Sequence, residues 1–207
     1  MKPEDARFTK AIIFINSLVP LGLLAWDAAH RNLGANPLEY VTRTTGMLTL
    51  IFLMLSLAVT PLRKLTGWNW LGMNRRMLGL YAFFYGALHF LTYIWFDRFF
   101  NFKSAIGDVV QRPFIAIGFA SFLIMVPLAV TSTNKMVKRL GGKRWNRLHK
   151  AVYLAGLLGA LHYYMLVKSD TRLPLTFAFV LAILLGYRIF ASNRSAKPAA
   201  RSSIVPR

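Results

Sequence analysis

Six apolar runs, each close to the length that crosses a bilayer, constrain this chain more than any other feature. A membrane-spanning helix needs about 20 mostly apolar residues, and 56% of the residues here are hydrophobic, with a mean hydropathy of +0.44. The chain is therefore expected to be an all-α, polytopic membrane protein over residues 1–191, followed by a basic, disordered cytoplasmic tail over residues 192–207. The predicted spans are residues 10–27, 46–62, 77–96, 113–132, 150–167 and 173–191.

The distribution of charge predicts the orientation of these spans. The formal net charge is +19, but the basic residues lie between apolar runs and form no single soluble basic face, which excludes a nucleic-acid-binding protein. If the N-terminus is inside, 19 of the 26 Lys and Arg residues fall on the inner side. The positive-inside rule then predicts that both termini are cytoplasmic, with basic loops facing anionic lipid headgroups.

The chain contains no cysteine. This excludes disulfides, iron–sulfur clusters held by thiolates and covalently attached c-type haem. Any metal must be held by histidine or oxygen ligands, or must arrive within a cofactor.

The sequence GALH occurs twice within apolar runs, ending at His89 and at His162. Gly86 and Gly159 stand three residues before these histidines, and an alanine stands seven residues before each. Because an ideal helix turns about 100° per residue, these small residues lie on nearly the same face as the histidine. Each imidazole therefore stands above a strip of helix with little bulk, where a large flat group has room.

The two histidines are predicted to lie at one depth, because their spans run in the same direction. Ionisable residues inside membrane spans are rare and indicate function. A facing pair of neutral imidazoles favours axial ligation of a b-type haem, which leaves no vacant iron position and so favours electron transfer. The alternative is that each histidine bonds a nearby hydroxyl or carbonyl while the small residues pack helices. Zinc is disfavoured, because no Cys, Asp or Glu lies at that depth.

A second candidate site lies at the cytoplasmic side. His149 begins the fifth span, while the third span offers only Arg75 and Arg76 at that level. Such a cationic site suits a flavin phosphate or a quinone head better than a second bis-histidine haem, although a second haem stays open. The alternative is that the arginines only anchor their helix at the interface.

Several motifs extend over the six predicted spans and occur in the order of one known family. They are NPLEYVTRTTG at residues 36–46, RRMLGLYAFFYGALHFLTY at 75–93, RPF at 112–114, LAVTSTNKMVKRLGGKRWNRLHKAVY at 128–153 and LHYYMLVK at 161–168. In these motifs the chain resembles the MsrQ family, formerly YedZ, the haem-binding membrane subunits of periplasmic methionine sulfoxide reductase systems.

The resemblance implies a six-helix, ferric-reductase-like transmembrane bundle in the bacterial inner membrane. It implies a non-catalytic subunit that delivers electrons to MsrP, a periplasmic molybdopterin enzyme that reduces methionine sulfoxide. The family's haem ligands fall on His89 and His162, and its third histidine falls on His149. The electron source is described as the quinone pool or a cytosolic flavin reductase, with FMN as a proposed cofactor. In the wider family both helices carry histidine pairs for two haems, whereas here Arg75 and Arg76 replace the inner ligand.

Two other functions remain open on the sequence. One is a membrane haem reductase that acts on a small external acceptor such as ferric iron. The other is a non-redox transporter, which is disfavoured because all seven Asp and Glu residues lie in predicted loops or near span ends.

Overall fold

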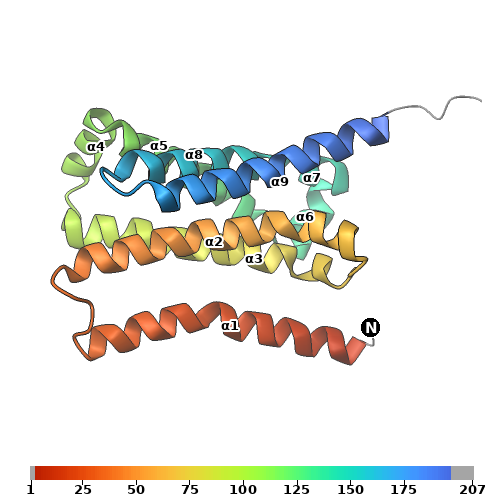
Figure 1. Cartoon of the computed structure of the whole chain (residues 1–207), viewed down its shortest axis with the longest axis horizontal. Coiled ribbons are helices and arrows are strands. Elements are labelled where there is room, and N and C mark those ends of the chain that lie inside the picture. Colours follow the sequence, from red (N-terminus) through yellow and green to blue (C-terminus); the bar gives the residue numbers. More distant parts are fainter. Residues whose placement is uncertain (1–2, 197–207) are drawn as a thin grey trace, which may run out of the picture.

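The computed structural model describes residues 3–196, and within this range every regular element is a helix. Figure 1 shows the helices running roughly side by side along one common axis. This confirms the all-α prediction. The elements are α1 (Pro3–Ala29), α2 (Pro37–Thr66), α3 (Leu71–Thr92), the π-helix η1 (Tyr93–Asp97), α4 (Phe102–Gln111), α5 (Pro113–Val130), α6 (Asn134–Leu140), α7 (Gly142–Leu148), α8 (Ala151–Leu166) and α9 (Arg172–Ala196).

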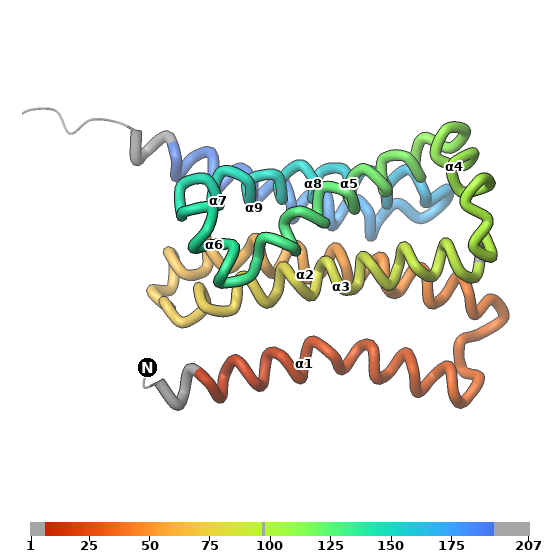
Figure 2. Tube along the Cα trace, turned by 180° about the vertical axis from the view of Figure 1, so that it is seen from behind, coloured from red at the N-terminus to blue at the C-terminus, as the bar shows by residue number. Residues whose placement is uncertain are grey.

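The long helices are arranged as packed pairs. Helix α2 packs along α3, α5 packs along α8, and α9 contacts both α2 and α8. In both views α1 lies on one side, beside α2 and α3, while α5, α8 and α9 lie on the other side (Figures 1 and 2). Helix α4 lies at one end of the bundle, which we call the α4 end. Helices α6 and α7 lie at the other, called the α6/α7 end, together with the N-terminal end of α1.

Five described helices are long and apolar enough to cross a membrane. The remaining predicted span, the fifth, corresponds to α8, which has only 16 residues and is therefore about 24 Å long, shorter than a hydrocarbon core of about 30 Å. It packs between two longer helices, α5 and α9. The five long helices are Arg7–Ala29, Pro37–Thr66, Leu71–Phe96, Pro113–Val130 and Arg172–Ser192.

Helix α2 begins earlier than the sequence analysis predicted. The second span was predicted to start at residue 46, but helix begins at Pro37. The side chain of Asn36 accepts a hydrogen bond of 3.2 Å from the backbone N–H of Glu39, and proline at the first helical position is already in helical geometry. Glu39 also pairs with Arg43 one turn later, at 2.6 Å. The local cap, which is independent of membrane depth, therefore sets this boundary.

The turn between α2 and α3 is also shorter than predicted. The predicted spans leave residues 63–76 between them, but α2 continues to Thr66 and α3 starts at Leu71. Gly67 ends α2 with a φ of +74°, and its N–H bonds the carbonyl of Arg63 at 3.1 Å. This left-handed residue is the usual C-terminal stop of a helix and favours glycine.

Two other links that were expected as loops contain helices. Residues 134–148 form α6 and α7, which meet at Gly141, where φ is +72°. The link over residues 97–112 contains α4. At the C-terminal end, α9 continues to Ala196, so residues 192–196 of the predicted tail are helical, and residues 197–207 lie outside the described part of the chain.

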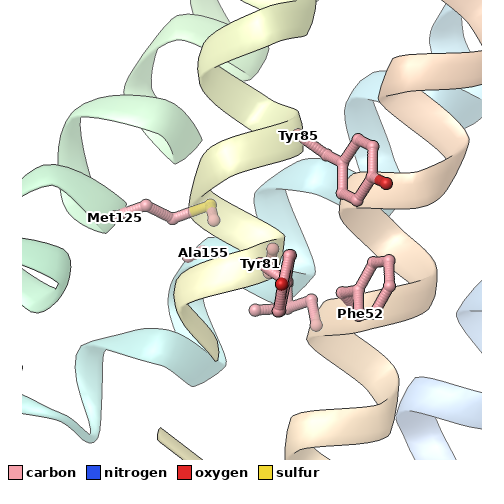
Figure 3. Close-up of a cluster of buried hydrophobic side chains, with 7 residues drawn as sticks. Phe52, Tyr81, Tyr85, Met125 and Ala155 are labelled. Atoms are coloured by element: carbon pink, nitrogen blue, oxygen red, sulfur yellow. The ribbon is translucent and has the colours of Figure 1, made fainter. Parts of the chain in front are cut away.

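A buried aromatic cluster in the middle of the bundle joins α1, α2 and α3. The rings of Phe52 and Tyr85 stack with centroids 5.3 Å apart and an interplanar angle of 8°; Figure 3 shows both rings beside Tyr81. Tyr85 donates a hydrogen bond of 2.7 Å to the carbonyl of Ser17, and Tyr81 donates one of 2.9 Å to that of Phe14. Both hydroxyls are therefore satisfied in an apolar interior, and both hold α1 against the rest of the bundle.

Candidate functional site

The structure brings His89 and His162 together at the α4 end. His89 lies in the last turns of α3 and His162 in the last turns of α8, and their ring centroids are 6.2 Å apart with an interplanar angle of 74°. Helices α3 and α8 belong to different packed pairs, so the contact between the two rings joins these pairs. The two spans thus reach the same depth, as their matched direction predicts.

Each imidazole uses the same nitrogen for a backbone contact. Nδ1 of His89 lies 2.9 Å from the carbonyl oxygen of Thr42, and Nδ1 of His162 lies 2.6 Å from that of Phe114. A carbonyl oxygen only accepts, so Nδ1 must carry the proton and donate in both rings. The proton-free Nε2 of each ring then keeps its lone pair, which is the tautomer that metal-binding histidines adopt when their other nitrogen is held by a carbonyl.

Two glycines on neighbouring helices make space for the rings. A Cβ atom added at Gly46 in α2 would lie 3.1 Å from both Nδ1 and Cε1 of His89. One added at Gly118 in α5 would lie only 2.7 Å from Nδ1 of His162, a distance that real Cβ atoms essentially never show. Each imidazole therefore lies directly on a helix backbone, and any larger residue at Gly118 must displace it.

The glycines of the GALH repeats have another role. A Cβ at Gly86 would lie 3.4 Å from Cγ2 of Thr49, and one at Gly159 would lie 3.2 Å from Cδ2 of Leu50. Both contacts are made to α2. In this arrangement the small residues before the histidines let α3 and α8 approach α2 closely, which is the helix-packing role that the sequence left open.

The paired rings fit one metal ion between them. Two imidazoles on opposite sides of one metal, each with a metal–nitrogen distance of about 2 Å, have ring centroids roughly 6 Å apart. The observed separation of 6.2 Å matches this value, and both Nδ1 atoms are already engaged. Among the described residues no group of three or more His, Cys, Asp or Glu could hold a metal. Two imidazoles at this spacing could hold one metal ion between them, and the remaining ligands of that ion would have to come from a cofactor or from other groups.

A buried carboxylate organises the backbone beside His162. Asp108 of α4 is 7% exposed and accepts a hydrogen bond of 2.6 Å from Tyr93. It also pairs with Arg98 at 2.6 Å and with Arg112 at 3.4 Å. Arg112 comes two residues before Phe114, whose carbonyl receives the Nδ1 proton of His162. The cluster therefore fixes η1, α4 and the start of α5 in the positions that the imidazole needs.

The predicted site at the α6/α7 end has different geometry. His149 stacks on Trp145 with centroids 3.7 Å apart. Its Nδ1 lies 3.1 Å from the carbonyl oxygen of Trp145, and its Nε2 lies 3.2 Å from that of Leu128 and 3.4 Å from Oγ of Ser132. Backbone carbonyls therefore lie beside both ring nitrogens, so that protein atoms occupy the positions from which a metal would approach in this arrangement.

Of the two arginines predicted there, Arg75 is the one whose charge acts on His149. Burial lowers the pKa of His149, which lies outside the long spanning helices, and the positive charge of Arg75 lowers it further. Arg76 instead donates a hydrogen bond of 2.7 Å to Asn134 of α6. The residues that were grouped by sequence thus separate into a pair, His149 and Arg75, and one arginine that links α3 to α6.

The sequence analysis did not identify Thr42, Gly46, Phe114 or Gly118 as parts of the site. A signal was present for three of them, since Thr42 and Gly46 lie in the motif NPLEYVTRTTG and Phe114 ends RPF. Helix periodicity could not show that these motif residues meet the two imidazoles, because the contacts join different helices.

Known proteins resemble this chain over most of its length. The family model of the ferric reductase like transmembrane component matches residues 45–160. A protein of Herminiimonas arsenicoxydans is 52% identical over 91% of this chain and 87% of its own length. One of Azospira oryzae is 47% identical over 99% and 88%, and one of Rhodospirillum rubrum is 48% identical over 94% and 93%. All three are named protein-methionine-sulfoxide reductase heme-binding subunit MsrQ.

The apolar helices and the family match define the class of this chain as a multi-pass membrane protein with a pair of facing histidines at one end of its bundle. Within that class, the chain belongs to the MsrQ family of the ferric reductase like transmembrane components.

Proposed function

We propose that this protein binds one b-type haem between His89 and His162 and passes electrons through it to a periplasmic methionine sulfoxide reductase. The observation that carries the proposal is the 6.2 Å separation of two imidazoles whose Nδ1 atoms are both held by backbone carbonyls. The names of the relatives, which describe heme-binding subunits of such a reductase, agree with it.

The protein's own residues would hold and orient the group. The carbonyls of Thr42 and Phe114 keep the Nδ1 protons in place, so that each Nε2 presents its lone pair. Gly46 and Gly118 let the rings approach the centre of the bundle. A bound haem supplies one-electron chemistry. His89 and His162 would both hold the iron and leave no position on it for a substrate, so the protein would act as an electron-transfer subunit without a catalytic residue of its own.

The proposed location is the bacterial inner membrane, with both termini in the cytoplasm. The bias of Lys and Arg toward one side of the predicted spans supports this orientation. The N-terminal end of α1 and the C-terminal end of α9 both lie at the α6/α7 end (Figure 1). The α6/α7 end would then be cytoplasmic and the histidine pair would lie toward the periplasm, on the side of the molybdopterin partner MsrP.

Electrons would enter at the α6/α7 end, from the quinone pool or from a cytosolic flavin reductase. Arg75, with Arg188, Arg63 and Tyr153 among its neighbours, gives this end a cationic interior suited to a quinone head or to the phosphate of FMN. The engaged nitrogens of His149 favour a single haem over two.

The decisive experiment combines spectroscopy with electron transfer. Purified protein is expected to show a Soret band, one haem per chain and one midpoint in a redox titration. Reduced protein mixed with purified MsrP should be reoxidised only when methionine sulfoxide is present. Reoxidation by a ferric chelate but not by MsrP would instead identify a reductase for small acceptors. Protein without any Soret band would refute the proposal and favour a non-redox role.

A further inference from the structure

A long seam between α2 and α9 on the bundle surface contains two adjoining clefts. The first, of about 260 Å³, lies between the middle of α2, around Met54, and the part of α9 around Phe177 and Leu184. The second, of about 690 Å³, continues along the same two helices toward the α6/α7 end, around Lys64 and Arg188. Figure 1 shows α2 and α9 side by side, running in the same direction, so the two clefts follow one another in depth.

The cleft nearer the α6/α7 end is basic. Lys64 of α2, Lys150 at the start of α8 and Arg188 of α9 line it, and no carboxylate of the described residues does. Three cations from three helices therefore meet around one hollow. Like charges gathered in this way repel one another unless an anion lies between them.

Arg188 is held rigidly in this cleft. Its two Nη atoms donate hydrogen bonds to the hydroxyl of Tyr153 at 2.8 Å and to the carbonyl of Leu57 at 2.9 Å, and its guanidinium lies 5.1 Å from the centre of the Tyr153 ring. Its Nε is buried and has no hydrogen-bond partner among the described residues. These contacts are all made to neutral groups, and none of them neutralises the charge of the guanidinium.

The other cleft is apolar. Side chains such as Met54, Leu55, Val180 and Leu184 line it, with Thr176 as its one polar residue. A hollow of this kind at membrane depth suits a hydrocarbon chain. The seam as a whole therefore presents three positive charges at one end and a hydrocarbon surface toward the middle of the bundle.

We propose that this seam binds one anionic phospholipid. Its phosphate lies among Lys64, Lys150 and Arg188, and an acyl chain lies along the apolar cleft. Charge complementarity favours an anionic lipid over the other candidates. A quinone has a similar hydrocarbon tail, but its head carries no negative charge to balance the three cations. A zwitterionic lipid has a phosphate, but its headgroup also carries a positive charge. Basic pockets between membrane helices bind anionic headgroups for the same reason. The proposal is independent of the haem, because the histidine pair lies at the other end of the bundle.

Native mass spectrometry of the haem-loaded protein tests this directly. With phosphatidylglycerol as the probe, we expect one tightly bound lipid per chain, and much weaker binding of phosphatidylcholine of the same chain length. The Lys64→Gln, Lys150→Gln double variant should bind phosphatidylglycerol about thirtyfold more weakly, given the usual strength of a basic residue beside an anionic lipid.

A matched control is the Lys135→Gln, Lys138→Gln double variant, which removes two exposed charges of α6 that do not line the cleft. It should bind phosphatidylglycerol as the unmodified protein does. Equal losses in both double variants, or equal binding of the two lipids, would overturn the proposal. Displacement of the lipid by added FMN would also overturn it and assign the basic cleft to the flavin phosphate.

A further variant tests the apolar cleft without altering charge. Ala58 lines that cleft, and Ala58→Phe would fill part of it. Affinity for long-chain phosphatidylglycerol should fall while affinity for a short-chain form changes little. Unchanged affinity for the long-chain lipid would contradict the placement of the acyl chain. An unaltered Soret spectrum in each variant shows that the fold around the histidine pair is intact.

Discussion

At the α4 end of the bundle, His89 and His162 each engage one ring nitrogen with a backbone carbonyl, whereas at the α6/α7 end His149 has polar neighbours at both nitrogens. The first two rings lie against glycines and face each other, while His149 lies against Trp145 with no second histidine opposite. The two ends thus differ in what lies beside the second nitrogen of each ring, and we propose that this difference makes His89 and His162, but not His149, metal ligands.

The sharpest way to break this comparison is to remove the histidines one at a time. His89→Ala and His162→Ala should each lose nearly all bound haem, because a six-coordinate iron loses an axial ligand. His149→Ala, the matched control at the other end, should keep its haem. The measurement is the Soret absorbance per protein after purification. Full haem content in His89→Ala or His162→Ala would refute the assignment of the ligands. Loss of haem in His149→Ala would instead support a second haem near His149.

The glycines beside the rings offer a finer test. Gly118→Ala places a Cβ 2.7 Å from Nδ1 of His162, so the ring or helix α5 must shift. Overpacking of this kind costs about 1–3 kcal/mol, and we expect a lower haem content and a shifted midpoint potential. Gly46→Ala, with its nearest contact at 3.1 Å, should have a smaller effect.

Gly107→Ala in α4, where an added Cβ meets nothing within 4 Å, serves as the control. It should leave both the haem content and the potential unchanged. Equal effects in all three glycine variants would show that backbone propensity, and not contact with the imidazoles, is responsible.

The carboxylate near His162 should matter more for stability than an exposed one. Asp108→Asn leaves Arg98 without its buried partner, and breaking a buried ion pair costs roughly 3–5 kcal/mol. The Arg98 side chain is 20% exposed, so we expect the lower end of that range. Glu39→Gln breaks a pair with Arg43 whose side chains are 48% and 63% exposed and should cost about 1 kcal/mol or less. Thermal unfolding in detergent compares the two, and similar midpoints would contradict a structural role for Asp108.

The smallest expected effect concerns His149 and pH. Burial, followed by the charge of Arg75, lowers the pKa of this ring below its ordinary value of 6.5. The unfolded chain therefore takes up a proton before the folded one does, so the stability contributed by neutral His149 is complete above pH 6.5 and is lost as pH falls through the folded pKa. The unfolding temperature of His149→Gln should fall less between neutral and mildly acidic pH than that of the unmodified protein. Parallel curves would show that other groups carry the pH dependence.

The sequence alone determined the class of fold, and it determined that His89 and His162 lie at the same depth. Hydrophobic run length and helix periodicity are local properties, so spans, and the repeated position of His89 and His162, follow from them directly. The helix ends were less predictable, because caps such as Asn36 and Gly67 act on the backbone independently of hydropathy.

Only the tertiary structure decided what surrounds each histidine. The carbonyls of Thr42 and Phe114 reach the rings across helices, and Gly46 and Gly118 come from α2 and α5, far from the GALH repeats in the chain. These contacts depend on which helices pack together and at what rotation. Those quantities arise from the sum of many weak contacts between helices and leave no periodic signal within any single helix.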